Sequence, residues 1–599
     1  MPQLIEDYAL VGNNATAALV GRNGSIDWLS FPRFDSAACF AGILGSDNDG
    51  HWTIAPLHDH PQVKRRYRKG TLVLETEFAT QDGAVLLTDC MDRRGDHQDV
   101  IRIVKGIRGR VAMRMELVIR FDYATIIPWV SRMEDGRLRA IAGPDQIVIA
   151  SPVETRGEDF KTIASFDVAE GDVFPFSITW ASSFGPLPKA FDAVQAMQNV
   201  SRAWERWSNK HKPKGDYADV VQRSLITLKA LTHHATGGIV AAPTTSLPEE
   251  IGGERNWDYR YCWLRDSTLT LFALMESGFT DEALAWREWM LRAVAGNPDR
   301  MQIMYGIAAE RRLTEFELTE LPGYEGSSPV RVGNAASEQL QLDVYGEVLD
   351  SFYQARKKGL PQLEAGWNLQ RALLGHLEEL WTKPDKGMWE VRGKPRHFVQ
   401  SKVMVWVAVD RAIRTIQEFG EEGPLERWIR WREHIRNEIL RFGFSTELNS
   451  FVQYYGSKEV DASLLMLPQV GFIAADDPRM LGTVAAIEKY LMPSGFVARY
   501  NTRSAVDGVS GDEGAFIACS FWLVDNYVMQ NRMKEARDLF ERLLTLQNDV
   551  GLLSEEWDPR ERRMLGNFPQ ALSHLALVNS AHNLTARHDE RPAHQRSRR

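Results

Sequence analysis

Cysteine is scarce in this chain. Its 599 residues include four, none of them in a C-x-x-C pair: Cys39, Cys90, Cys262 and Cys519. This spacing argues against a zinc ribbon and against a disulfide framework, and it favours a reducing compartment. The histidines lack an H-x-x-x-H spacing, so the sequence predicts no metal site and no cofactor.

Long apolar runs and an excess of positive charge are also missing. No stretch approaches the roughly 18 apolar residues of a membrane span, and residues 1–7 lack the basic and apolar regions of a secretory signal. The 71 Lys and Arg residues against 80 Asp and Glu give a net charge of −9, which removes the electrostatic case for nucleic acid. We therefore expect a cytoplasmic protein without membrane or nucleic-acid partners. Whether it forms a homo-oligomer stays open.

The first third of the chain has the pattern of β-structure. Two strand-like runs, residues 71–80 and 84–88, flank a Gln-Asp-Gly turn, which is a hairpin signal. Similar runs recur as far as residues 174–181. Many short strands without helices between them predict an antiparallel β-sandwich. We assign this domain, with its linker, to residues 1–210.

After residues 212–215 the apolar residues recur at helical spacing. About twelve helical segments in one unit predict an (α/α)6 toroid over residues 211–586, and residues 587–599 are predicted to be a disordered tail. An α-solenoid is disfavoured because no internal repeat is present. The helices are expected to begin near residues 217, 266, 281, 335, 363, 400, 424, 461, 478, 512, 532 and 568.

Long loops rich in Gly, Pro and aromatic residues separate these helices, and loops of this length are usually functional. We expect them to converge on the central funnel of the toroid. They cover roughly residues 240–265, 313–334, 383–399, 493–511 and 550–567.

One of these loops contains the segment WDYRYCWLRD, residues 257–266. Aromatic residues and then Arg265 occupy alternate positions. In an extended chain they would all point to one side. Aromatic rings with polar edges suit the faces and hydroxyl groups of sugars, although an aromatic core strand would produce the same alternation.

Two glutamates lie beside or near tryptophans in Gly-flanked loops: Glu390 in GMWEV and Glu555 in GLLSEEWD. A carboxyl group desolvated beside an indole can have a raised pKa and act as a general acid. A second carboxylate can activate water, and glycoside hydrolysis requires such a pair. With 80 acidic residues in the chain, neither motif is specific by itself.

Taken together, the motifs resemble glycoside hydrolase family 15, which contains glucoamylases and prokaryotic trehalases. The resemblance covers nearly the whole chain. Residues 5–36 resemble the β-domain that precedes the catalytic domain in the trehalase-like members. The helical part carries, in the family's order, TTSLPE, NWDYRYCWLRDS, GNAASEQLQLDVYGEVLDS, GMWEVRG, ARYN and SEEWDP.

Carried over residue by residue, the resemblance implies a general acid at Glu390 and a general base at Glu555. Arg265 and Asp266 would hold the terminal glucose. One departure is Val391, which follows the acid where fungal members have a second acidic residue. The remaining expected substrate-binding residues are Tyr259, Trp263, Trp389, Arg499 and Glu556, the last of which could instead tune the base.

The implied activity is inverting hydrolysis of a terminal α-linked glucose, with α,α-trehalose as the favoured substrate. Glucoamylase-type action on malto- or isomalto-oligosaccharides stays open. Two other classes are a toroid phosphorylase, which Glu555 argues against, and a non-catalytic sugar-binding protein, which the intact pair argues against. Some residues have less certain roles. Trp257 and Tyr261 are expected to pack. Glu347 is expected to be structural or to support the residues that touch the substrate. Glu513 is expected to cap a helix, with a substrate contact as the alternative, and Glu249 either to line the funnel or to be solvated.

Overall fold

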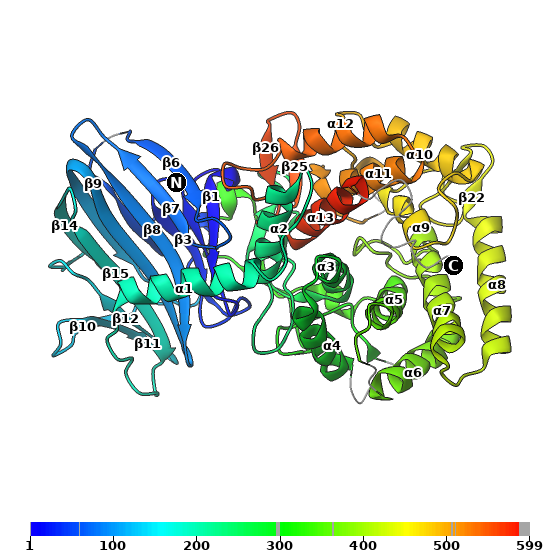
Figure 1. Cartoon of the computed structure of the whole chain (residues 1–599), viewed down its shortest axis with the longest axis horizontal. Coiled ribbons are helices and arrows are strands. Elements are labelled where there is room, and N and C mark those ends of the chain that lie inside the picture. Colours follow the sequence, from blue (N-terminus) through cyan, green and yellow to red (C-terminus); the bar gives the residue numbers. More distant parts are fainter. Residues whose placement is uncertain are drawn as a thin grey trace.

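The computed structural model describes residues 2–58, 60–294, 300–361, 364–504, 507–509 and 511–585. The predicted tail, residues 587–599, and the start of a helix near residue 363 lie outside these ranges. Figure 1 shows a β-sheet part beside a ring of helices, with the helix α1 running along the sheets towards the ring.

The β-sheet part is organised around one long strand, β9 (His97–Val118). The first half of β9 pairs with β8 (Gly83–Arg94) and β15 (Val173–Ser182). Its second half pairs with β5 (His51–Pro56) and β14 (Lys161–Ala169). All four pairings are antiparallel, so β9 belongs to two sheets at once. The predicted antiparallel β-domain is confirmed.

The other strands extend these two sheets. On the side of β5 and β14 they are β1 (Tyr8–Gly12), β2 (Ala17–Gly21), β3 (Ser25–Ser30), β4 (Ala38–Phe40) and β13 (Arg156–Glu158). On the side of β8 and β15 they are β6 (Gln62–Tyr67), β7 (Leu74–Ala79), β10 (Trp129–Arg132), β11 (Leu138–Ala142) and β12 (Asp145–Ala150). Apolar residues from both sheets belong to one continuous core.

The helix α1 (Ala193–Ser208) was not expected, because the sequence pattern up to about residue 210 predicts only strands. Asp192 caps its first turn, and Met197, Val200 and Trp204 recur at helical spacing on its buried face. This face packs against β8, β9 and β15. The boundary near residue 210 itself stays a prediction.

Six helices of the described chain form an inner ring: α3 (Leu264–Glu276), α5 (Asp343–Lys357), α7 (Val399–Phe419), α9 (Met466–Gln469, preceded by a 3-10 turn at Ala462–Leu465), α11 (Ile517–Met529) and α13 (Ala571–Thr585). Each contacts the next, and α13 contacts α3. The ring therefore closes, which a solenoid does not do. The predicted toroid is confirmed.

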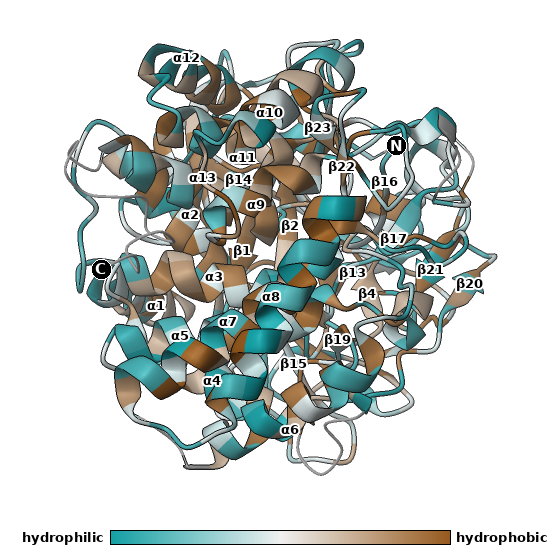
Figure 2. Ribbon diagram, turned by 90° about the vertical axis from the view of Figure 1, so that its right-hand side faces the viewer, coloured by the Kyte–Doolittle hydropathy of each residue, from teal (hydrophilic) through white to brown (hydrophobic). Residues whose placement is uncertain are grey.

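Six further helices pack outside this ring: α2 (Ala218–Ala230), α4 (Thr280–Val294), α6 (Glu364–Leu380), α8 (Leu425–Phe442), α10 (Pro478–Tyr490) and α12 (Met533–Leu544). They are amphipathic. In α8 the buried residues are Trp428, Trp431, Ile435 and Ile439, and Figure 2 shows its hydrophilic face turned outward. In the part of the chain that the structure describes, no helix combines the length and apolar character that crossing a bilayer requires.

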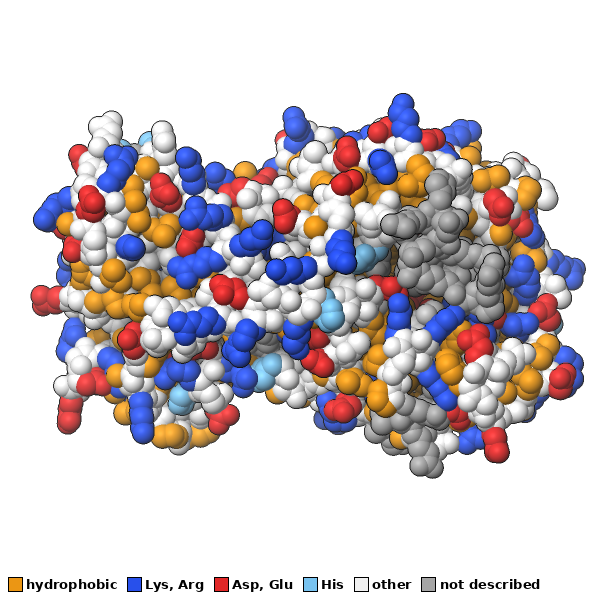
Figure 3. Space-filling model, in the orientation of Figure 1, with side chains coloured by type: hydrophobic (Ala, Val, Ile, Leu, Met, Phe, Trp, Pro, Cys, Tyr) orange, Lys and Arg blue, Asp and Glu red, His pale blue; other side chains and the backbone are white. Residues whose placement is uncertain are grey.

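Short strands stiffen the loops at one end of the ring. They are β16 (Thr245–Pro248), β17 (Asn256–Asp258), β18 (Cys262–Trp263), β19 (Met304–Tyr305), β20 (Phe316–Leu318), β21 (Val330–Val332), β22 (Phe444–Ser445), β23 (Ser450–Phe451), β24 (Ala515–Phe516), β25 (Glu556–Asp558) and β26 (Arg563–Leu565). On the face drawn in Figure 3, basic and acidic side chains are interspersed over both parts of the molecule.

The segment between β17 and β18 also touches the β-sheet part. Arg260 is fully buried and pairs with Asp258, with Nε to Oδ1 at 2.9 Å and Nη2 to Oδ2 at 2.8 Å. The same guanidinium donates to the Ser36 carbonyl (2.8 Å) and to the Tyr123 hydroxyl (2.7 Å), both in the β-sheet part. Trp28 Nε1 donates to the carbonyl of Pro243 (2.8 Å). Buried polar groups thus join the two parts.

Candidate active site

Two adjoining pockets lie over the N-terminal ends of α3, α11 and α13. Eight of the nine residues predicted for the site line the inner pocket: Tyr259, Trp263, Arg265, Asp266, Trp389, Glu390, Arg499 and Glu555. Four of these, Tyr259, Trp389, Glu390 and Arg499, also line the outer pocket. Other outer-pocket residues include Glu249, Arg255, Trp257, Asn334, Arg392 and Asp507. Glu390 therefore lies where the pockets meet.

Glu390 is held in a left-handed backbone conformation, with a φ of 60°. This conformation costs a non-glycine residue about 1–3 kcal/mol and often occurs at functional sites. Trp263 Nε1 donates to Glu390 Oε1, and Arg265 Nη2 lies 3.7 Å from the same oxygen. Burial raises the pKa of Glu390, whereas Arg265 and the Trp263 N–H oppose the shift. A buried carboxyl with a raised pKa suits proton donation.

Arg265 is fixed from two directions. Its Nε donates to Asp266 Oδ1 at 2.9 Å, and its Nη1 donates to the carbonyl of Met388. Both side chains are more than nine-tenths buried. The first turn of α3 is therefore bonded to the loop that carries Glu390, which orients the donors and acceptors of the inner pocket.

Glu555 lies just before β25 and is almost fully buried. Its Oε2 accepts from the backbone N–H of Asn567 at 3.2 Å. Burial and the nearby carboxylate of Glu249 raise the pKa of Glu555 to about 8, whereas Arg499 and the Tyr259 hydroxyl lower it. Gly566 has a φ of 72°, and a Cβ there would lie 2.5 Å from Glu555 Oε2, so only glycine leaves room for this carboxyl.

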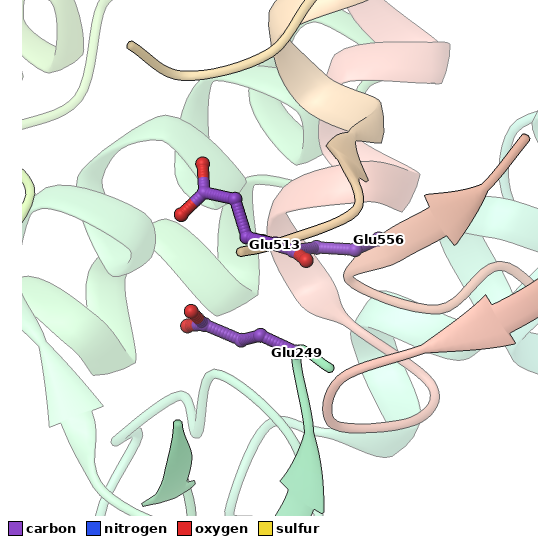
Figure 4. Close-up of side chains that lie close together, drawn as sticks. All are labelled: Glu249, Glu513 and Glu556. Carbon is purple, nitrogen blue, oxygen red and sulfur yellow. The ribbon is translucent and has the colours of Figure 1, made fainter. Parts of the chain in front are cut away.

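The buried side chains of three glutamates, Glu249, Glu513 and Glu556, lie close together (Figure 4), and Arg499 pairs with them. Its Nη2 is 2.8 Å from Glu249 Oε2, 2.6 Å from Glu513 Oε2 and 3.6 Å from Glu556 Oε1. Oxygens of the three glutamates lie within 4.8 Å of one another, a spacing that could hold a metal ion. The guanidinium already supplies the positive charge at this place, and a bound cation would be repelled by it. We therefore interpret the three glutamates as partners of the Arg499 side chain and not as ligands of a metal ion.

Trp389 supports Arg499 from one side. The Arg499 guanidinium carbon lies 5.8 Å from the Trp389 ring centre and 5.2 Å from that of Phe516. Trp389 Nε1 donates to Asp461 Oδ1 at 2.8 Å, and the indole stacks on Trp522 with centroids 5.9 Å apart. The indole is therefore a fixed wall between the two pockets.

The other glutamates considered in the sequence analysis have different outcomes. Glu556 lines neither pocket: it is fully buried behind Arg499 and accepts from the N–H of Gly514 at 2.8 Å. The capping role expected of Glu513 is wrong, because α11 begins only at Ile517 and the carboxyl pairs with Arg499 instead. Glu347 is buried within α5, as expected.

The aromatic alternation is only partly realised. Trp257 lines the outer pocket although it was expected only to pack, whereas Tyr261 is buried and lines neither pocket. Sequence reasoning left Glu249 open and missed Arg255 and Asp507. Glu249 lies in the motif TTSLPE, and that motif is the signal that could have identified it.

Comparisons with known proteins decide the family. The model described as "Glycosyl hydrolases family 15" matches residues 215–582, more than half of the chain. This chain belongs to glycosyl hydrolase family 15. A second model, "Trehalase-like, N-terminal", matches residues 1–169, in agreement with the resemblance seen in the sequence.

Two relatives named trehalase align with nearly the whole chain. A trehalase of Thermoplasma volcanium is 35% identical over 591 residues, which is 97% of this chain and 93% of that protein. A trehalase of Mycobacterium tuberculosis is 36% identical over 608 residues, covering 96% of this chain and 89% of that protein. A bacterial glucoamylase complexed with acarbose superimposes with a TM-score of 0.70, covering 97% of this chain and 94% of its own. At 14% identity this structure shows the fold alone.

Proposed function

We propose that this family 15 member is an inverting hydrolase of α,α-trehalose, with Glu390 as the general acid and Glu555 as the general base. The observation that carries the proposal is the meeting of two pockets at Glu390. Two pockets suit two glucose rings, with the bond between them at the shared carboxyl. The relatives named trehalase support this choice of substrate.

In the proposed mechanism one glucose occupies the inner pocket, where Arg265, Asp266 and Arg499 orient its hydroxyl groups. Glu390 donates its proton to the glycosidic oxygen as the bond to the anomeric carbon breaks. Glu555 accepts a proton from a water molecule, whose oxygen attacks that carbon from the opposite face. An inverting pair requires carboxyl groups roughly 6.5–9.5 Å apart. Exchange with solvent then returns each carboxyl to its starting state.

We also propose a cytoplasmic location. All four cysteines are buried and free of disulfides, which suits a reducing compartment.

A substrate panel with anomeric detection tests the proposed activity. We expect α,α-trehalose to be hydrolysed with a higher kcat/KM than maltose or isomaltose. Polarimetry or early NMR spectra should show β- and α-glucose in equal amounts, because the attacked ring inverts and the leaving ring keeps its α configuration. Release of α-glucose alone would contradict inversion. Preference for maltose would contradict the proposed substrate.

The pH profile tests the role of Glu555. A general base must be ionised, and the pKa of Glu555 is raised to about 8. Because Glu390 must at the same time be protonated, we expect kcat/KM, which reports ionisations of the free enzyme, to be bell-shaped in pH, with the limb that reports Glu555 near pH 8. Glu249→Gln removes a neighbouring negative charge, lowers the pKa of Glu555 and should move this limb to lower pH.

Glu513→Gln is the matched control for this profile. Glu513 belongs to the same cluster around Arg499, but it is not among the principal causes of the pKa shift of Glu555, whereas Glu249 is. The limb should therefore move less than in Glu249→Gln. Equal displacement in both variants, or none in Glu249→Gln, would argue against Glu555 as the titrating base.

A further inference from the structure

One wall of the outer pocket contains a stack in which two guanidinium groups lie over one indole ring. The guanidinium carbon of Arg392 lies 4.2 Å from the Trp257 ring centre, and that of Arg331 lies 4.6 Å from it. Cations within about 6 Å of an indole ring centre are attracted by its ring electrons. Trp257 and Arg392 line the pocket, whereas Arg331 stands behind them.

Glu315 holds the two arginines in place. Its Oε1 and Oε2 accept from Arg392 Nη1 at 3.0 Å and Nη2 at 2.6 Å, a bidentate arrangement. Arg331 Nε lies 3.8 Å from Glu315 Oε1. Glu315 itself does not line the pocket. A single carboxylate thus connects the loop before β20, the strand β21 and the loop that carries Glu390.

Asp507 continues this wall around the pocket. Its carboxylate accepts from the Tyr500 hydroxyl at 3.0 Å and from Arg255. Its carbonyl accepts from the backbone N–H of Gly393 at 2.8 Å. Since Gly393 follows Arg392, hydrogen bonds join the stack to Asp507. Trp257, Arg392 and Asp507 all line the outer pocket, so this bonded wall bounds the space that a sugar can occupy there.

Inside the wall, polar atoms are available for one sugar. Glu249 Oε1 is buried and has no hydrogen-bond partner in the part of the chain described, and buried polar atoms are normally paired. Asn334 and Arg392 line the same pocket and carry N–H donors. The edge of the Trp257 indole adds an aromatic surface of the kind that sugar rings contact.

We propose that the Arg331–Trp257–Arg392 stack, fixed by Glu315 and joined to Asp507, closes a subsite that accepts one glucose unit beyond Glu390. The wall makes this site selective for disaccharides over longer α-glucans. Arg392 and Trp257 would touch the second glucose, whereas Glu315 would act through Arg392 as a positioning residue. This inference rests on the proposed function, which places the cleaved bond at Glu390.

The test compares substrates with and without a second sugar in the purified full-length protein. α-Glucosyl fluoride fills only the inner pocket, because fluoride is its leaving group. In Arg392→Ala we expect kcat/KM for trehalose to fall roughly 10-fold or more, as for loss of a charged hydrogen bond, mainly through KM. Activity on α-glucosyl fluoride should stay within about twofold, and the ratio of maltotriose to maltose hydrolysis should increase.

Glu315→Gln should change the same ratios in the same direction, although it removes no pocket atom. Arg427→Ala is the matched control, since Arg427 forms a comparable bidentate pair with Glu378 on the outer helices. Arg427→Ala should leave kcat/KM unchanged for all of these substrates. Thermal unfolding of each variant verifies that the fold is retained.

Two results in Arg392→Ala would overturn the inference. One is an unchanged kcat/KM for trehalose together with an unchanged ratio of maltotriose to maltose hydrolysis. The other is an equal loss of activity on trehalose and on α-glucosyl fluoride. Failure of the proposed function gives a different result, because the wild-type protein would then cleave α-glucosyl fluoride but not trehalose.

Discussion

Glu390→Gln is expected to lower kcat for trehalose by about 10³-fold, within the range for loss of a general acid, and to retain most activity on α-glucosyl fluoride. The glutamine cannot protonate a departing sugar oxygen, whereas fluoride departs without protonation. Steady-state rates on the two substrates measure the difference. The indole N–H of Trp263, which donates to Glu390 Oε1, can still bond to the amide oxygen, so the pocket should keep its shape.

Glu555→Gln is the matched variant. Its activity on trehalose and its activity on α-glucosyl fluoride should fall by a similar factor, because water must be activated in either reaction. Calorimetric binding of trehalose should persist in both variants. Full activity of either variant on trehalose would remove that residue from the mechanism. Equal losses of Glu390→Gln on both substrates would contradict its role as the acid.

Arg499→Met should be the most destabilising single change in the site. It would leave Glu249, Glu513 and Glu556 buried without the guanidinium that lies 2.6–3.6 Å from them. Removing one partner of a buried ion pair costs about 3–5 kcal/mol of unfolding free energy. We expect a lower thermal midpoint, and loss of trehalose hydrolysis because Arg499 lines both pockets.

The pH dependence of the thermal stability of Arg499→Met distinguishes the effect of the lost charge from the effect of lost packing. Protonated carboxyls need no cation, so the deficit in stability should shrink as the pH is lowered. Adding Glu513→Gln to Arg499→Met removes one unpaired carboxylate and should restore part of the lost stability. A midpoint equal to that of the wild-type protein at neutral pH would mean that Arg255 or protonation compensates fully for the missing guanidinium.

Periodicity was enough to predict helices such as α2, in which Val221, Leu225 and Leu228 recur at helical spacing on the buried face, and the number of helices indicated the toroid. It was not enough for α1, whose amphipathic pattern followed a long series of strands. The alternation from Trp257 to Arg265 also failed in part, because the structure forms only the short strands β17 and β18 there.

The inner pocket was largely predictable because its residues lie in ordered motifs, whereas the outer wall was not. Trp257 and Arg392 do lie in two of these motifs, but Glu315 and Asp507 lie in none of them, and no local spacing connects the four residues. Glu513 illustrates the same limit. Its position near an expected helix start predicted a cap, but α11 begins only at Ile517 and the carboxyl pairs with Arg499.

The contacts of Arg260 have a consequence for engineering. The segment that presents Tyr259 and Trp263 to the substrate pockets turns Arg260 away from them, towards Ser36 and Tyr123 of the β-sheet part. A fragment containing only the helices would expose this guanidinium and lose the support behind the active-site segment. Chimaeras between family members should therefore exchange both parts together, or transfer Tyr123 and Arg260 as a pair, since Ser36 supplies only its backbone carbonyl.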